Sequence, residues 1–182
     1  LFAAHCASCH RYNGHDGRGY PVDDAQSAPE LAGFASVEWI TKLLTHKHYV
    51  SDEYFGGTAF KDGTMARKVL AKYTPEETAL LPRIARLLSD MAELPYQEPL
   101  EEEEREELLS LFYNDDLDFQ DGLACIDCHD IDSEEEGYAP DLTGYGSDEW
   151  TVAFIKNPED DRFYGEDNDR MPFYGRDTKL TG

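Results

Sequence analysis

Two copies of one cysteine motif constrain this chain more than any other feature of its sequence. The pattern Cys-x-x-Cys-His occurs at residues 6–10 and again at residues 125–129, and the two copies use all four cysteines. Two residues between the thiols allow one helical turn to present both sulfurs together, and the next residue adds an imidazole. An adequate interpretation must explain each cysteine pair together with its histidine.

This motif is the attachment signature of c-type haem. The two thiols bond the vinyl groups of one haem, and the histidine binds the iron as its proximal ligand. The sequence therefore predicts two covalently bound haem c groups, with these attachment cysteines and iron-binding histidines: Cys6, Cys9, His10, Cys125, Cys128 and His129. A zinc site of four thiolates would leave both histidines unexplained. A thioredoxin-like redox pair needs a strand–helix setting that the sequence does not suggest.

A longer internal repeat follows each motif. Residues 28–39 (APELAGFASVEW) align with residues 139–150 (APDLTGYGSDEW), and each copy continues to an aromatic-glycine segment and then a methionine. The order of these features is the same in both copies. We therefore expect two haem domains, residues 1–95 and residues 96–182.

Helix signals recur along the chain and no strand pattern is convincing, so the predicted fold class is all-α. Serine caps followed by an acidic residue predict helices over residues 36–45 and 147–156. A Thr-Pro-Glu-Glu capping box predicts a helix over residues 74–94, with a bend or a later start near Pro82. After a linker bounded by two prolines, residues 100–112 have an acidic helical pattern, with an apolar face of Leu108, Leu109 and Phe112.

The motifs resemble the class I cytochrome c family, and in particular tandem dihaem cytochromes c. This resemblance covers almost the whole chain and implies two small all-α domains, each wrapped around one haem. It assigns the sixth iron ligands to Met65 and Met171. The second lies in an Arg-Met-Pro segment like the family's Met-Pro loop, whereas the first lacks the proline. For the first haem, the alternative sixth ligands are His15, His46 and His48, and the remaining methionine, Met91, is interpreted as helix core.

The resemblance also implies residues that support each haem. The carbonyls of Pro29 and Pro140 would accept the N–H of the proximal imidazole, which orients the ring and strengthens the ligand. Leu31 and Leu142 would pack against the haem faces. Four further side chains could bond haem propionates, although core packing or plain exposure is the simpler role for each: Trp39, Trp150, Arg67 and Arg170.

Charge and composition narrow the function further. The chain has 39 acidic and 16 basic residues, a net charge of −23, which excludes a nucleic-acid binder that must neutralise phosphates. No apolar run approaches the roughly 18 to 20 residues of a membrane-spanning helix. Aromatic residues make up 12% of a chain that is only 40% hydrophobic. Two haems would supply the core that the side chains alone do not.

The sequence thus predicts an electron carrier rather than an enzyme. Two His/Met haems would relay single electrons between redox partner proteins, at least one of them basic. A dihaem peroxidase-like enzyme and a haem-based sensor are the alternatives, and the peroxidase needs one haem with an open distal side. Because haem attachment follows export, the expected location is the periplasm or the outer face of the bacterial cytoplasmic membrane.

The resemblance is incomplete at both ends of the chain. Only five residues precede Cys6, where the family has a longer helix, and no C-terminal helix follows Met171. We therefore expect the chain to be part of something longer, such as a protein with a membrane anchor or a fused redox subunit. Local motifs also resemble the c-type modules of bacterial quinol-oxidising cytochrome bc complexes.

Overall fold

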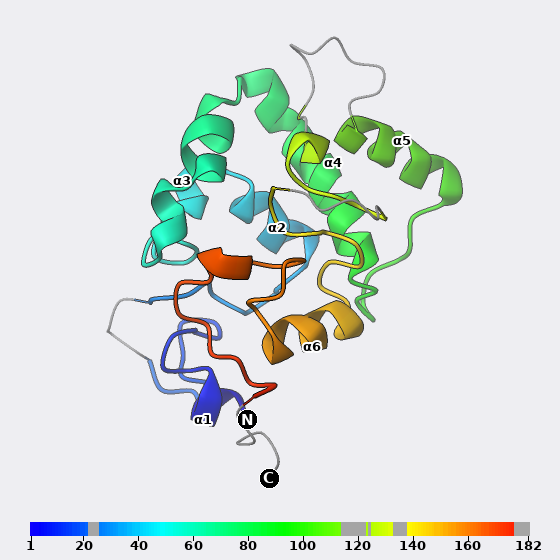
Figure 1. The fold of residues 1–182 in the computed structure, drawn as a ribbon. Helices are drawn as coiled ribbons and strands as arrows, with labels where there is room; N and C mark the ends of the chain where they lie inside the picture. Colours follow the sequence, from blue (N-terminus) through cyan, green and yellow to red (C-terminus); the bar gives the residue numbers. More distant parts are fainter. Residues whose placement is uncertain (22–25, 114–122, 124, 133–137, 177–182) are drawn as a thin grey trace. The chain divides into compact units, whose positions relative to one another are not determined.

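A computed structural model describes residues 1–21, 26–113, 123, 125–132 and 138–176. Helices connected by loops make up the described residues, which contain no strand, in agreement with the predicted all-α class (Figure 1). In chain order the elements are α1 (Phe2–His5), α2 (Val37–Leu43), α3 (His46–Tyr49), η1 (Ala59–Asp62), η2 (Met65–Val69), η3 (Leu70–Lys72), α4 (Pro75–Met91), α5 (Glu102–Tyr113), η4 (Cys125–Asp127), α6 (Asp148–Lys156) and η5 (Gly165–Asp167).

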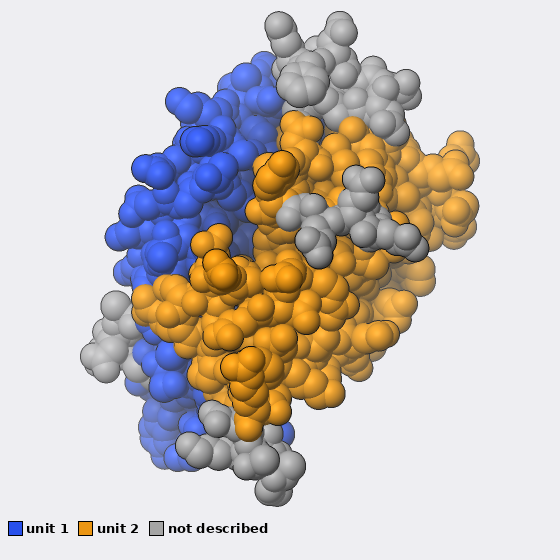
Figure 2. All heavy atoms as spheres, viewed as in Figure 1, with its two compact units in different colours: residues 1–82 blue, residues 83–182 orange. Residues whose placement is uncertain are grey.

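The chain forms two compact units. Unit 1 comprises Leu1–Pro82 and unit 2 comprises Arg83–Gly182 (Figure 2). The boundary falls inside α4, which continues through Pro82 without the later start that the sequence suggested. This division does not test the expected haem domains over residues 1–95 and 96–182, which stay a prediction.

In unit 1, a serine fixes the start of α2. The Ser36 hydroxyl accepts a hydrogen bond from the Trp39 amide at 3.2 Å, so the predicted cap is confirmed. Such a cap satisfies one of the amides that the first helical turn leaves without a partner. The helix ends at Leu43 rather than at the expected Thr45, because Thr45 adopts an extended backbone conformation (φ −92°, ψ 117°) and precedes the separate helix α3.

Unit 2 repeats this cap. The Ser147 hydroxyl accepts a hydrogen bond from the Trp150 amide at 3.1 Å. The helix α6 then ends at Lys156, as predicted, and Asn157 follows in a non-helical conformation (φ −146°, ψ 81°). The residue before a proline is disfavoured in helical geometry, and Pro158 comes next.

The capping box at the start of α4 is also confirmed. The Glu77 amide donates to the Thr74 hydroxyl at 3.2 Å, and the Thr74 amide donates to the Glu77 carboxylate at 2.6 Å. The helix ends at Met91 rather than at the expected Leu94. Two residues beyond this end, Glu93 has a positive φ of 50°, which stops further helical growth.

A buried carboxylate organises the connection between α4 and α5 within unit 2. One oxygen of Asp90 accepts the Leu100 amide at 2.7 Å, and the other pairs with the Arg105 guanidinium. On α5 the buried side chains are Leu108, Leu111 and Phe112, whereas Leu109 is half-buried. The predicted apolar face therefore omitted Leu111, which is buried, and included Leu109, which is only half-buried, although helical spacing allows either leucine beside Leu108 and Phe112.

Unit 1 has a small apolar cluster at α3. Tyr49, which is 6% exposed, packs with Ala66 and Leu70, and the half-buried Met65 lies against them. Burial raises the pKa of the Tyr49 hydroxyl to about 12. The folded state therefore holds this proton more tightly than the unfolded chain, whose tyrosines ionise near pH 10.

This shift predicts an alkaline loss of stability that Tyr49→Phe reduces. The contribution of Tyr49 is fully present below about pH 10 and is lost as the pH rises towards about 12. In urea titrations across that interval, the variant should lose about 1 to 3 kcal/mol less unfolding free energy than the parent chain. Tyr12→Phe, at a tyrosine that is 54% exposed, is the control and should lose as much as the parent. Equal losses in the parent and in Tyr49→Phe would contradict the prediction.

Candidate haem sites

Both cysteine motifs fold into the same turn. The carbonyl of the first cysteine accepts hydrogen bonds from the amides of the second cysteine and of the histidine. The two distances are 3.1 and 2.9 Å in residues 6–10, and 3.2 and 2.9 Å in residues 125–129. All four cysteines are free thiols. This turn is the local geometry that the spacing of the motif predicts.

A proline carbonyl holds each motif histidine. The carbonyl oxygen of Pro29 lies 2.7 Å from Nδ1 of His10, and that of Pro140 lies 2.8 Å from Nδ1 of His129. Because a carbonyl can only accept, Nδ1 carries the proton in both rings. The other nitrogen, Nε2, is then the one with a lone pair for a metal ion. Both predicted hydrogen bonds form, and the haem-binding role of these residues stays a prediction.

The protonation states of these groups suit a c-type haem. Burial lowers the pKa of His10 and of His129, against the opposing influence of the proline carbonyls, so both rings are neutral at pH 7. Burial also raises the pKa of the Cys6 thiol and raises that of the Cys125 thiol to about 12. Neutral imidazoles beside free thiols fit covalent haem attachment. Within the described ranges, no group of three or more His, Cys, Asp or Glu side chains is placed to hold a metal ion, as a zinc site would require.

The leucine that follows each proline anchors the chain next to the histidine. The Leu31 amide donates to the carbonyl of Arg11 at 2.9 Å, and the Leu142 amide donates to the carbonyl of Asp130 at 2.8 Å. Each acceptor is the residue directly after a motif histidine. Both leucine side chains are half-buried, and their packing against a haem face stays a prediction.

Both tryptophans bond to backbone carbonyls, and Trp39 is buried, in line with core packing, whereas Trp150 is half-buried. The Trp39 indole donates to the Glu30 carbonyl at 2.8 Å, and the Trp150 indole donates to the Asp141 carbonyl at 3.2 Å. Each indole also lies against an aromatic ring from the aromatic-glycine segment, with a centroid distance of 5.2 Å in both units. These contacts hold Glu30 and Asp141, the residues that directly follow the two prolines, in position.

Left-handed backbone shapes the turn between each leucine and its tryptophan. Gly33 has φ +71° and Gly144 has φ +66°, a region that glycine enters without steric cost. Two residues later the chain is left-handed again, at Ala35 (φ +62°) and at Gly146 (φ +80°). The two units thus follow the same path with different residues, which the sequence analysis did not anticipate at Ala35.

Residues 1–81 match the Cytochrome c family model. The match includes the first cysteine motif, the proline–leucine segment and Met65, and it covers less than half of the chain. It supports a class I cytochrome c domain in this part of the chain, with covalently bound haem c and a role in electron transfer. The chain has no match among curated proteins and none among solved structures. No helix within the described ranges is long and apolar enough to cross a membrane.

The two methionines predicted as sixth ligands have different surroundings. Met65 begins the π-helical turn η2 and lies against the apolar cluster of unit 1. Met171 lies in a loop where the Asn168 side chain bonds both its amide (3.3 Å) and its carbonyl (3.0 Å). Both side chains are half-buried. Their ligation of the cytochrome iron stays a prediction, as do the alternatives: His15 in the turn after the first motif, and His46 and His48 on α3.

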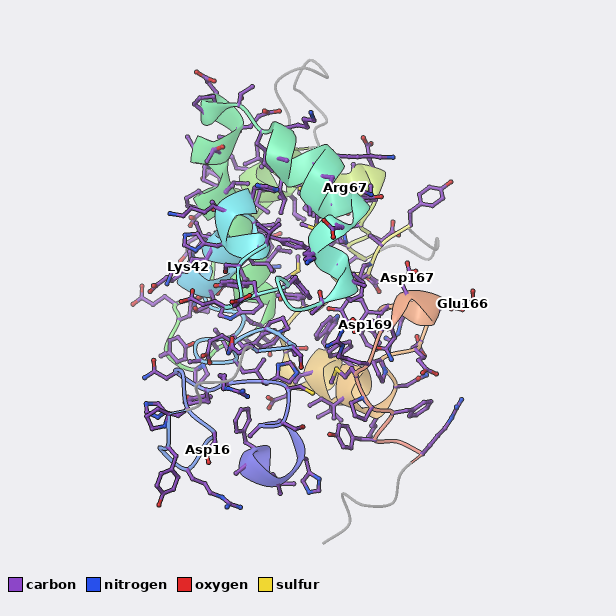
Figure 3. All side chains as sticks on the ribbon, turned by 90° about the vertical axis from the view of Figure 1, so that its left-hand side faces the viewer. Asp16, Lys42, Arg67, Glu166, Asp167 and Asp169 are labelled. Carbon is purple, nitrogen blue, oxygen red and sulfur yellow. The ribbon has the colours of Figure 1, made fainter. Side chains whose placement is uncertain are left out.

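The remaining predicted side chains are two arginines and Met91. Arg67 is exposed on η2 (Figure 3). Arg170 pairs with the neighbouring Asp169, with 3.1 Å between the guanidinium and the carboxylate. Met91 is half-buried at the end of α4, rather than fully within the core. A bond from either arginine to a haem propionate stays a prediction.

Sequence reasoning missed one residue of the first site, Glu30. Its carboxylate accepts three backbone amides, those of Asn13 (2.7 Å), Gly14 (2.9 Å) and Ala32 (3.0 Å). The signal in the sequence was an acidic residue after the proline in both copies of the repeat. The repeat by itself predicts no role for this acidic residue, because a bond from a side chain to a distant amide leaves no periodic pattern in the sequence.

The indole bonds yield a prediction about stability. Trp39→Phe keeps an aromatic ring but leaves the half-buried Glu30 carbonyl without the indole donor, so it should cost about 1 to 2 kcal/mol of unfolding free energy. Trp150→Phe should cost less, because the bond of Trp150 is longer and its side chain is only half-buried. Urea denaturation followed by circular dichroism would measure both. Equal stability of the parent and Trp39→Phe would show that the indole bond does not support this segment.

Proposed function

We propose that the chain is a dihaem c-type cytochrome that relays single electrons between redox partner proteins. Each haem would be bound through one cysteine motif and ligated by histidine and methionine. The observation that carries the proposal is the repetition, in unit 2, of the hydrogen-bond network around the histidine of unit 1. The family match alone covers only residues 1–81.

The repetition extends over five different contacts. The motif turn, the histidine–proline bond, the leucine amide bond, the indole bond and the serine cap all recur in the same order along the chain. Corresponding distances differ by no more than 0.4 Å, the largest difference being between the two indole bonds, 2.8 and 3.2 Å. The aromatic ring five residues before each tryptophan also packs edge-on against it, with centroids 5.0 Å apart in both units. A second site of the same kind as the first is the simplest reason for such a copy.

The chain's own residues would prepare each site for electron transfer. The bound haem supplies the one-electron centre. His10 and His129 are neutral, have fixed tautomers and keep Nε2 for the iron, and the carbonyls of Pro29 and Pro140 make the imidazoles stronger donors. Thioether ligation from a methionine opposite the histidine raises the reduction potential. An iron with both axial positions filled has no place for a substrate, which favours a carrier over an enzyme.

We extend the proposal to location and partners. Cytochrome c domains typically lie outside the cytoplasm, where haem is attached after export, so we propose the periplasm or the outer face of the membrane. With a net charge of −23, the chain favours a basic redox partner, and their association would slow as salt rises. Attachment to a membrane complex of the quinol-oxidising cytochrome bc type is part of the same proposal.

The haem content of the chain tests the proposal directly. Expressed with haem-attachment machinery, the parent should carry two haems per chain, measured by intact mass and by the absorbance of the pyridine haemochrome. Replacing both cysteines of either motif by alanine should remove one haem and leave the other, because each pair serves one haem. A parent with a single haem, or unchanged haem content after Cys125→Ala/Cys128→Ala, would contradict the dihaem proposal.

The sixth ligands have a separate test. Met65→Ala and Met171→Ala should each abolish about half of the long-wavelength absorption that methionine gives to ferric haem. Each should also lower one of the two potentials by roughly one to a few hundred millivolts, within the range of about 0.8 V that axial ligands set. Met91→Ala is the matched control and should change neither. An unchanged spectrum in Met65→Ala would show that Met65 is not the sixth ligand, and His15, His46 and His48 would then be the candidates to substitute.

A further inference from the structure

We propose that Glu30 in unit 1 and the pair Asp141 and Thr143 in unit 2 are positioning residues for the two proximal histidines. They would act by clamping the loop after each histidine to the segment after each proline. The inference rests on the proposed function, since it concerns how each histidine is presented to its haem. It adds that the two units reach one geometry with different side chains.

In unit 1 the clamp is a single carboxylate. One oxygen of Glu30 accepts the Asn13 amide at 2.7 Å and the Ala32 amide at 3.0 Å, and the other accepts the Gly14 amide at 2.9 Å. Asn13, the third residue after His10, has a left-handed backbone (φ +55°). Asparagine adopts this conformation more readily than most residues other than glycine, and the bonds from the Asn13 and Gly14 amides to Glu30 hold the loop in it.

In unit 2 the same loop is held by a hydroxyl. Asp132, the third residue after His129, also has φ +55°. Its amide donates to the Thr143 hydroxyl at 2.7 Å, whereas the Asp141 carboxylate accepts the Thr143 amide at 2.8 Å. The Asp141 side chain is one methylene shorter than that of Glu30. In unit 2 the Thr143 hydroxyl, rather than the carboxylate, accepts the hydrogen bond from the loop amide.

The two sets of residues are therefore matched as pairs. The repeat aligns Glu30 with Asp141 and Ala32 with Thr143. In unit 1 the long acid reaches the loop by itself and the neighbouring position is alanine. In unit 2 the short acid is accompanied by a hydroxyl. Shortening the acid of unit 1 alone should break its clamp, and adding the threonine hydroxyl as well should restore it.

The clamp lies next to the bond that orients the histidine. Glu30 directly follows Pro29, whose carbonyl accepts the His10 Nδ1 proton at 2.7 Å. The Glu30 carboxylate holds Asn13, three residues after His10, next to the residue that follows Pro29. The His10–Pro29 bond is thus flanked by a second contact between the same two segments. A looser clamp would weaken the bond and make the imidazole a poorer donor, which destabilises the ferric state and raises the potential.

The test exchanges the pair of unit 1 for that of unit 2 in the haem-loaded full chain. Glu30→Asp keeps the charge but shortens the reach. It should raise the hydrogen-exchange rate of the Asn13 amide about tenfold or more, and raise one of the two haem potentials. Ala32→Thr alone should change neither quantity. Glu30→Asp/Ala32→Thr should return the Asn13 exchange rate and the potential to near the parent values, which a loss of packing alone would not do.

Unit 2 provides a second arm, in case a unit 1 variant does not fold. Thr143→Val removes the hydroxyl at nearly constant shape and should speed exchange of the Asp132 amide and raise the other potential, whereas Thr143→Ser should change neither. Parent-like exchange and potential in Glu30→Asp and in Thr143→Val would overturn the proposal. Faster exchange with unchanged potentials would overturn the link to the histidine. A parent without haem at residues 6–10 would refute the proposed function itself, and haem content is therefore measured first.

Discussion

The hydrogen bond between the histidine ring and the proline carbonyl is the interaction on which the rest of both sites depends. It joins residues that are 19 positions apart in unit 1 and 11 apart in unit 2, yet its length is 2.7 and 2.8 Å. The longer loop of unit 1 therefore leaves the length of this hydrogen bond almost unchanged. A bond preserved across different loop lengths indicates that the orientation of the imidazole, rather than the path of the loop, is what both units specify.

The contacts around this bond explain how each unit holds it. The leucine amide bonds to the residue after the histidine and so connects it to the proline segment. The tryptophan indole bonds to the carbonyl of the acidic residue after the proline. The serine cap begins the helix that contains this tryptophan. The leucine, tryptophan and serine that make these contacts recur in both units, whereas positions beside them differ. Ala35 stands where unit 2 has Gly146, and Glu30 stands where unit 2 has Asp141. The geometry is the repeated feature, and the residues vary where another group can supply the same hydrogen bond.

The sequence predicted the features that depend on interactions between neighbouring residues. It did not predict those that depend on contacts between distant residues. Serine caps, the capping box at Thr74 and the end of α6 before Pro158 follow from interactions between near neighbours, and the structure confirms them. The end of α2 depends on one extended residue, Thr45, and its sequence does not reveal that conformation. Two of the three amides bound by Glu30 belong to Asn13 and Gly14, which lie 17 and 16 residues away in the chain, so only the folded chain brings them to the carboxylate. Ligation of iron by methionine lies further still from any pattern in the sequence, because it depends on the haem itself.

The differences between the units bear on what a relay of electrons requires. Under the proposed function, haems with unequal potentials would favour electron transfer in one direction, and differences between the two units would produce unequal potentials. The two methionines have unequal surroundings, since Met65 lies against an apolar cluster and Met171 is held through its backbone by Asn168. The clamps differ too, with a carboxylate holding the loop in unit 1 and a neutral hydroxyl holding it in unit 2. A negative charge close to a haem favours the ferric state, but each clamp contains one carboxylate, Glu30 or Asp141, so the surroundings of the two methionines are the difference that would separate the two potentials.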